Sequence, residues 1–187
     1  MSKTLKILLP IGLILLFTII SGVSSYNGLV TQEESVKQAN SKIETALQRR
    51  NDLIPNYVAV TKKYMKHEEE IFTKIAEARS KIGSSDKNTK NEGEGELSSA
   101  ISRLLVVQEK YPELKADKQA SELTAELAGT ENRLFVVRND YNAVATKYNQ
   151  SIRTFPRSMF AKMFGFERAE LIEAPKEAKT APKVDLN

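Results

Sequence analysis

Two glutamates are the residues best placed for chemistry. Glu68 falls on the same helical stripe as apolar residues, and Glu131 lies at a similar depth on a later helix if consecutive helices alternate in direction. Two carboxylates held close together raise each other's pKa, which suits general acid–base catalysis. A buried carboxylate without a partner would cost several kcal/mol, so the position itself demands one.

Asn40 and Arg133 fall close enough to the same level to join the two glutamates. The interpretation we favour is structural, because polar residues in the seam of helical assemblies fix the register of neighbouring helices. The alternative is a metal- or carboxylate-dependent site. The predicted polar layer therefore comprises Asn40, Glu68, Glu131 and Arg133, and we assign no catalytic, cofactor-binding or metal-binding residue.

Other chemistries find little support in the residue types. His67 in "KHEEE" is the sole histidine, whereas structural zinc takes about four ligands and di-metal bundle sites draw carboxylates and histidines from several helices. Cysteine is absent, which excludes disulfides and thiolate catalysis. No nucleophile elbow, phosphate-binding glycine loop or HExxH motif occurs. We therefore expect no enzyme and no cofactor.

The net charge of +4 comes from 28 basic and 24 acidic residues spread along the chain. That balance indicates solubility rather than nucleic-acid binding.

The N-terminal segment from Ile7 to Val23 is apolar and follows Lys3 and Lys6. With its uncharged extension it reaches about the ~30 Å of a bilayer's hydrocarbon core, so we expect it to span the lipid bilayer. The lysines predict a cytoplasmic N-terminus, with the rest on the periplasmic or extracellular side of the cytoplasmic membrane. The alternative is a cleaved signal peptide, with Val23 and Ser25 as the small residues before the cut.

Apolar residues at alternating spacings of three and four predict four helices beyond this segment. We expect helices over residues 29–53, 57–82, 97–111 and from about 118 to Thr154, with Pro55 separating the first two. An arginine–aspartate pair from Arg49, Arg50 and Asp52 would satisfy backbone groups at that corner. Residues 83–96 contain no large apolar side chain and are predicted to form a solvated loop, with a capping box of Asn91 and Glu94.

The fourth helix carries a heptad seam typical of a coiled-coil-like bundle. Its members are Leu127, Leu134, Tyr141, Tyr148 and Phe155, interleaved with Thr130, Val137 and Val144. The predicted fold is all-α, an N-terminal transmembrane helix followed by an elongated antiparallel four-helix bundle with a short C-terminal helix. We divide it into a membrane anchor over residues 1–25, the bundle over 26–170 and a disordered tail over 171–187.

The short helix predicted within "FPRSMFAKMFGF" is apolar at helical spacing. Four antiparallel helices that start at a membrane return this stretch to the membrane side. It then either caps the end of the bundle or lies in the membrane interface as an amphipathic helix. The residues concerned are Met159, Phe160, Met163, Phe164 and Phe166.

Five ordered blocks resemble the LemA family: "YNGLV", "RRNDLIPN", "RLLVVQEKYPELKA", "TENRLFVVRNDYNAVATKYN" and "FPRSMFAKMFGF". The resemblance covers residues 7 to about 170. It implies a bacterial protein with one N-terminal membrane helix, an antiparallel helical bundle and no established reaction.

These observations predict a non-enzymatic adaptor or scaffold that binds other envelope proteins. The partner is unknown, and a homo-oligomer is possible. The alternative is a metal- or carboxylate-dependent enzyme, or a ligand sensor, that uses the polar layer.

Overall fold

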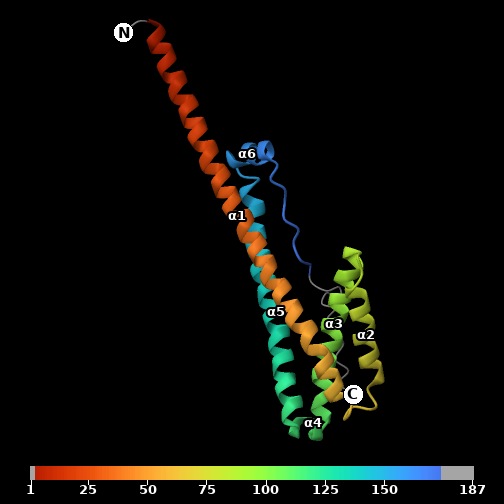
Figure 1. The fold of residues 1–187 in the computed structure, drawn as a ribbon. Coiled ribbons are helices and arrows are strands. Elements are labelled where there is room, and N and C mark those ends of the chain that lie inside the picture. The colour runs from red at the N-terminus through yellow and green to blue at the C-terminus, as the bar shows by residue number, and fades with distance from the viewer. Residues whose placement is uncertain (1–2, 174–187) are drawn as a thin grey trace, which may run out of the picture. The chain divides into compact units, whose positions relative to one another are not determined.

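The computed structural model describes residues 3–173, with side chains described from Leu8, and this part of the chain is helical without strands. Figure 1 shows the elements: α1 (Lys3–Thr61), α2 (Glu69–Ile82), α3 (Lys87–Val107), the 3₁₀ turn η1 (Gln108–Lys110), α4 (Pro112–Ala116), α5 (Lys118–Ser151) and α6 (Arg157–Phe164). The predicted all-α class is confirmed for the described residues. The predicted tail lies outside them from residue 174 onward.

The chain forms two compact units. Unit 1 contains residues up to Ile43 together with Val137–Ile172, and unit 2 is built on Glu44–Val136. Each unit is considered by itself below.

The predicted break at Pro55 is wrong, because α1 continues through it to Thr61. A proline inside a helix removes one backbone hydrogen bond and costs about 3 kcal/mol. Pro55 itself is exposed, while Leu53, Ile54 and Tyr57 around it are buried. Burying each of those side chains contributes roughly 1.5–3 kcal/mol, which offsets the loss. The turn between helices lies instead at residues 62–68.

The predicted loop holds for residues 83–86 but is wrong from Lys87 onward, where α3 begins. The predicted capping box of Asn91 and Glu94 is wrong for the same reason, because both residues lie inside α3. Its N-cap is Asp86, whose Oδ2 accepts from the backbone N–H and the hydroxyl of Thr89, both at 2.7 Å. A Cβ added at Gly93 would lie 2.8 Å from the carbonyl oxygen of Ala78. Glycine thus lets the backbone of α3 approach the backbone of α2 closely, so this stretch packs without a large apolar residue.

Unit 2 has its own apolar core, drawn from α1, α2, α3, α4 and α5. Helices α2 and α3 run antiparallel, since Lys81 pairs with Glu96 near one end and Glu70 with Arg103 towards the other. The buried core residues are Leu53, Ile54, Tyr57, Met65, Ile71, Phe72, Ile75, Ala78, Leu97, Ala100, Ile101, Leu104, Leu114, Ala120 and Leu127.

The predicted apolar stripes are mostly confirmed by burial. In the heptad seam of α5, Leu127, Leu134, Tyr141 and Tyr148 are buried. Phe155 departs from the prediction at 76% exposed, because α5 ends at Ser151 and the helical register is lost before it. On α1, the predicted positions Leu29, Val36, Ala39, Ile43, Ala46 and Leu53 are all buried.

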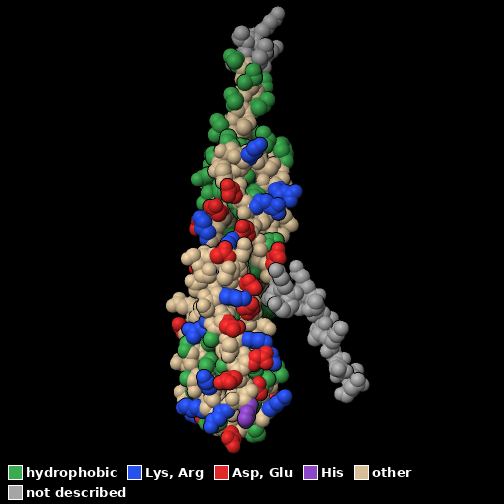
Figure 2. Space-filling view, turned by 90° about the vertical axis from the view of Figure 1, so that its right-hand side faces the viewer, with side chains coloured by type: hydrophobic (Ala, Val, Ile, Leu, Met, Phe, Trp, Pro, Cys, Tyr) green, Lys and Arg blue, Asp and Glu red, His purple; other side chains and the backbone are tan. Residues whose placement is uncertain are grey.

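The apolar N-terminal part of α1 differs from the rest of the helix. Its large side chains from Leu8 to Val23 are exposed, and hydrophobic side chains cover this stretch in Figure 2. By length and composition this is the one helix among the described residues that could cross a membrane. So apolar and so largely exposed a stretch suits an apolar surrounding such as the hydrocarbon core of a bilayer.

Candidate functional site

The most deeply buried charged group in the described part of unit 2 is the guanidinium of Arg50, on α1. It forms ion pairs with Glu94 of α3 and with Glu131 of α5, the latter at 3.3 Å. Nη1 of Arg50 also donates to the hydroxyl of Ser98 at 2.9 Å. We call these four residues the Arg50 cluster. It joins three helical segments of unit 2 through one cation.

Burial makes this cluster energetically sensitive. The Arg50 side chain is 0% exposed, against 8% for Glu94 and 18% for Glu131. A charge moved out of water costs several kcal/mol unless it is paired with good geometry, so each partner depends on the others. Nε of Arg50 has no hydrogen-bond partner within the described structure, which adds to that cost. These contacts connect segments of α1, α3 and α5 within unit 2.

The structure distributes the four residues of the predicted polar layer. Glu131 belongs to the Arg50 cluster, whereas Glu68 lies in the turn before α2 and accepts a hydrogen bond from the Tyr111 hydroxyl at 3.2 Å. Burial of the Tyr111 phenol, followed by the nearby Glu68 carboxylate, raises the pKa of Tyr111. Arg133 of unit 2 and Asn40 of unit 1 are exposed. His67 is exposed in the turn before α2.

Arg50 and Glu94 are the residues that our sequence reasoning missed, although a signal was present. Arg50 occupies the buried stripe of α1, at positions 43, 46, 50, 53 and 57, and Glu94 starts the stripe of α3, at 94, 97, 101, 104 and 108. The predicted helix break at Pro55 places Arg50 at a helix corner instead of inside a helix. The predicted loop likewise makes Glu94 a capping residue instead of a buried one.

A second polar contact in unit 2 is neutral. The Tyr57 hydroxyl donates to Oε1 of Gln108 at 2.6 Å, and the Thr124 hydroxyl donates to the same oxygen at 2.9 Å. Burial raises the pKa of Tyr57, so this phenol stays protonated at neutral pH. These groups bind one another across α1, η1 and α5, as register-fixing groups do.

The predicted membrane-interface residues all lie in unit 1, on α6 or just after it. Some of them contact α1, and others are exposed. Phe160 packs on Gly22 of α1, where an added Cβ would lie 3.1 Å from the ring. The rings of Phe164 and Phe166 meet Tyr26 edge to face, with centroids 5.0 and 5.8 Å apart. Gly22 lies at the end of the apolar stretch of α1, and Tyr26 lies just after it. The helix is therefore attached at the end of that stretch.

Large apolar side chains of α6 also keep much of their surface exposed. Met159 is 64% and Met163 is 67% exposed, and Phe164 keeps 47% exposure beside Tyr26. Phe155, which precedes the helix, is also exposed. Together these four side chains form an apolar surface, here called the α6 surface, next to the end of the apolar stretch.

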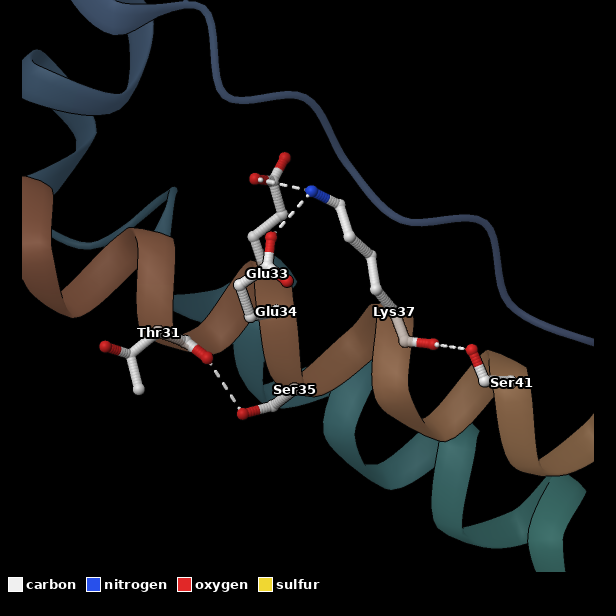
Figure 3. Close-up of polar contacts among 6 residues, drawn as sticks. All are labelled: Thr31, Glu33, Glu34, Ser35, Lys37 and Ser41. Carbon is white, nitrogen blue, oxygen red and sulfur yellow. Dashed lines mark hydrogen bonds and ion pairs between the residues drawn. The ribbon is translucent and has the colours of Figure 1, made fainter.

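Polar side chains on the exposed side of α1 in unit 1 bond to neighbours on the same helix. Figure 3 shows Ser35 and Ser41 donating to carbonyls one turn earlier, at 2.8 and 3.1 Å. Lys37 pairs with Glu34 at 2.8 Å and Glu33 at 3.4 Å, and the bond to Glu34 raises the pKa of Lys37. Such exposed i,i+3 and i,i+4 pairs contribute only a few tenths of a kcal/mol each. This side of the helix is a solvated surface.

Comparison with known proteins finds relatives that match most of the chain. Relatives include magnetosome protein MamQ 2 of Paramagnetospirillum magneticum, 28% identical over 175 residues that cover 79% of this chain and 64% of the relative. The match to MamQ of Magnetospirillum gryphiswaldense is 26% identical and covers 86% of this chain and 72% of the relative. Protein LemA of Metamycoplasma hominis is 27% identical, with 81% and 70% covered.

The chain thus spans less than two thirds of the length of MamQ 2. The LemA family model matches residues 39–186, which is most of the chain and includes the Arg50 cluster, α6 and the segment after it. This chain belongs to the LemA family.

Proposed function

We propose that this LemA-family chain is a membrane-anchored adaptor or scaffold that binds other envelope proteins without catalysing a reaction. Its helices would form the antiparallel four-helix bundle expected from the sequence. The single observation that carries the proposal is the exposed apolar stretch of α1 with the α6 surface attached at its end. One surface suits the hydrocarbon core and the other suits the interface.

The α6 surface supports a second membrane contact. Apolar side chains along a short helix, together with the basic residues Arg157 and Lys162, are the composition of interfacial helices. Phe160 on Gly22 and Phe166 on Tyr26 fix α6 at the end of the span, where the interface would lie. Tyr26 suits the same level, since aromatic residues concentrate at membrane–water interfaces.

The pairing of buried polar groups supports a non-catalytic role. The Arg50 cluster and the Tyr57–Gln108–Thr124 contact direct their charges and hydroxyls at one another. Groups committed to internal bonds of this kind stabilise a scaffold, whereas acid–base chemistry needs a group poised for substrate. We therefore assign the proposed binding of partners to exposed surfaces of the helices.

In-cell photo-cross-linking tests the adaptor role. A photoreactive amino acid replaces Phe135, which is 66% exposed, or Val106, which is 69% exposed, and Lys147 serves as a polar control position. We expect adducts with other envelope proteins from Phe135 or Val106 in intact cells. Recovery of self-adducts alone from all positions would contradict the proposal.

Cysteine labelling tests the orientation, and the cysteine-free sequence makes single-cysteine variants clean. We expect Asn88→Cys to react with a membrane-impermeant maleimide in intact cells, because unit 2 would lie outside the cytoplasmic membrane. Thr18→Cys, inside the apolar stretch, should stay unlabelled in intact and lysed cells. Labelling of Asn88→Cys only after lysis would place unit 2 in the cytoplasm.

A further inference from the structure

The segment after α6 is held on α5 by side-chain amides. Asn149 donates from Nδ2 to the carbonyl of Ala169 and accepts from the N–H of Ala169, both at 2.8 Å. Asn142 makes the same pair of bonds to Ile172, both at 2.9 Å. The Tyr141 hydroxyl donates to the carbonyl of Glu170 at 2.8 Å. We call these three side chains of α5 the asparagine ladder.

The spacing of the ladder selects an extended chain. Seven residues on a helix rise about 10.5 Å, and the two asparagines bind residues only three apart. The bound segment must therefore advance about 3.5 Å per residue, which is close to the rise of a fully extended strand. It runs antiparallel to α5, since the later asparagine holds the earlier residue. A helical or turned ligand would not meet both asparagines.

The ladder recognises backbone and not side chains. All five hydrogen bonds go to main-chain N–H or carbonyl groups of residues 169–172. Of the side chains of this segment, Glu170 is exposed and Leu171 is 49% exposed, while Ala169 and Ile172 are half-buried. The ladder side chains are more enclosed, since Asn149 is 6% and Tyr141 is 9% exposed. The binding side chains are thus held in place on α5. Because their hydrogen bonds go to the backbone, these bonds do not depend on the side chains of the bound segment.

We propose that the asparagine ladder is a binding site for an extended polypeptide of little restricted sequence, that residues 169–172 are its resident ligand, and that an extended segment of a partner protein takes their place. The mode resembles the addition of a strand to a sheet edge, where main-chain bonds supply affinity. Proline is excluded at the two positions whose N–H groups the asparagines bind. This inference deepens the proposed adaptor function, on which it rests, by naming the class of partner.

The test empties the ladder within the full chain. Ala169→Pro with Ile172→Pro removes both bonded N–H groups, and the purified protein in detergent micelles is then titrated with a fluorescein-labelled peptide, GFERAELIE, of residues 165–173. Fluorescence polarisation should show binding about tenfold or more tighter than to the wild type, whose own segment competes at high effective concentration. The matched control is Glu167→Pro with Leu171→Pro, whose amides the ladder does not bind in the described structure; it should behave like the wild type.

Two comparisons define the ligand class. Asn142→Ala with Asn149→Ala, added to the emptied chain, should weaken the peptide about tenfold or more, because four hydrogen bonds are lost. A scrambled peptide without proline should bind within about threefold of the original, while a peptide with proline at the positions of Ala169 and Ile172 should not bind. Equal binding with and without the asparagines, or no binding to a folded emptied chain, would overturn the proposal.

A second measurement covers the case in which the emptied chain fails to fold. Excess unlabelled peptide is added to the wild type, and hydrogen exchange of the segment over residues 166–173 is followed. Displacement should speed exchange there while α1 is unchanged, and no change at saturating peptide would overturn the inference. Neither assay contains another envelope protein, so their failure is distinct from a failure of in-cell cross-linking, which tests the adaptor role itself.

Discussion

The Arg50 cluster of unit 2 and the asparagine ladder of unit 1 solve the same problem with opposite chemistry. The cluster uses a fully buried cation and two carboxylates on three helical segments. The ladder uses neutral amides that bind backbone groups of a segment without helix or strand. Charges depend on every partner being present, whereas amides bind any extended backbone. The cluster therefore fixes one arrangement, and the ladder permits exchange.

The largest expected effect comes from breaking the cluster. Arg50→Ala leaves the buried Glu94 carboxylate without its cation, and we expect a loss of about 3–5 kcal/mol in the free energy of unfolding. Denaturant unfolding of the full chain in micelles measures it. The neighbouring Arg49→Ala is the control, since Arg49 pairs with Glu126 at the surface and should cost less than about 1 kcal/mol. Equal effects of the two variants would contradict the assigned difference in burial.

Filling the contact between α2 and α3 should be nearly as damaging. Gly93→Val places atoms within 3 Å of Ala78 backbone and the Lys81 side chain, where an added Cβ already lies at 2.8 Å, so we expect a loss of about 2–3 kcal/mol. Gly129→Ala is the control, because nothing lies within 4 Å of a Cβ there and alanine favours the helix by about 1 kcal/mol. In thermal unfolding, the Tm of Gly93→Val should lie below that of the wild type, and the Tm of Gly129→Ala should lie above it.

On the ladder, one amide should matter less to global stability. Asn149→Ala removes two hydrogen bonds to Ala169, with an expected loss of roughly 1–2 kcal/mol that is confined to the bound segment. Hydrogen exchange should quicken at residues 166–172 and stay unchanged in unit 2. If Asn149→Ala instead reduced the stability of unit 2 as a whole, the ladder would contribute to global stability as the cluster does, and the expected difference between them would be contradicted.

The smallest effect concerns pH. The N–H of Ala120, followed by the Tyr64 hydroxyl, lowers the pKa of Asp117 at the start of α5. A carboxyl with a lower pKa in the folded state stabilises the protein above its unfolded pKa of about 4, and the contribution is lost as pH falls through the folded value. Asp117→Asn should therefore be less stable than wild type at pH 7, with the gap closing as the wild type is acidified. If the difference in stability between the two proteins widened on acidification, the pKa of Asp117 would not be lowered by folding, and the prediction would be contradicted.

The sequence predicted those parts of the fold that depend on periodic burial. The spacing of three and four residues located the stripe of α1 from Leu29 to Leu53 and the seam of α5 as far as Tyr148. It failed where one residue was given more weight than its surroundings. Pro55 predicts the end of a helix that its buried neighbours maintain, and the lack of large apolar residues over 83–96 predicts a loop where Gly93 allows close packing.

The sites were harder to predict because their bonds join distant residues. Arg50 and Glu94 sat at apolar positions of their stripes, which marked them as buried, but nothing in the sequence paired them across 44 residues. The amides of Asn142 and Asn149 are seven residues apart on one face, yet their ligand is a backbone that carries no sequence signature. The α6 residues were foreseen as a group, and only the contacts with Gly22 and Tyr26 divide them.

The central claim is that the buried charged groups of the Arg50 cluster hold helices in place and that partners bind elsewhere. It is tested most directly by replacing the cluster as a whole, with Arg50→Met, Glu94→Leu and Glu131→Met in one chain, and repeating the unfolding and in-cell cross-linking experiments. Removing both signs of charge together leaves no unpaired ion, so we predict stability within about 1 kcal/mol of wild type or above it, and unchanged adducts from Phe135 and Val106. A chain that folds as well as the wild type but loses those adducts would contradict the account.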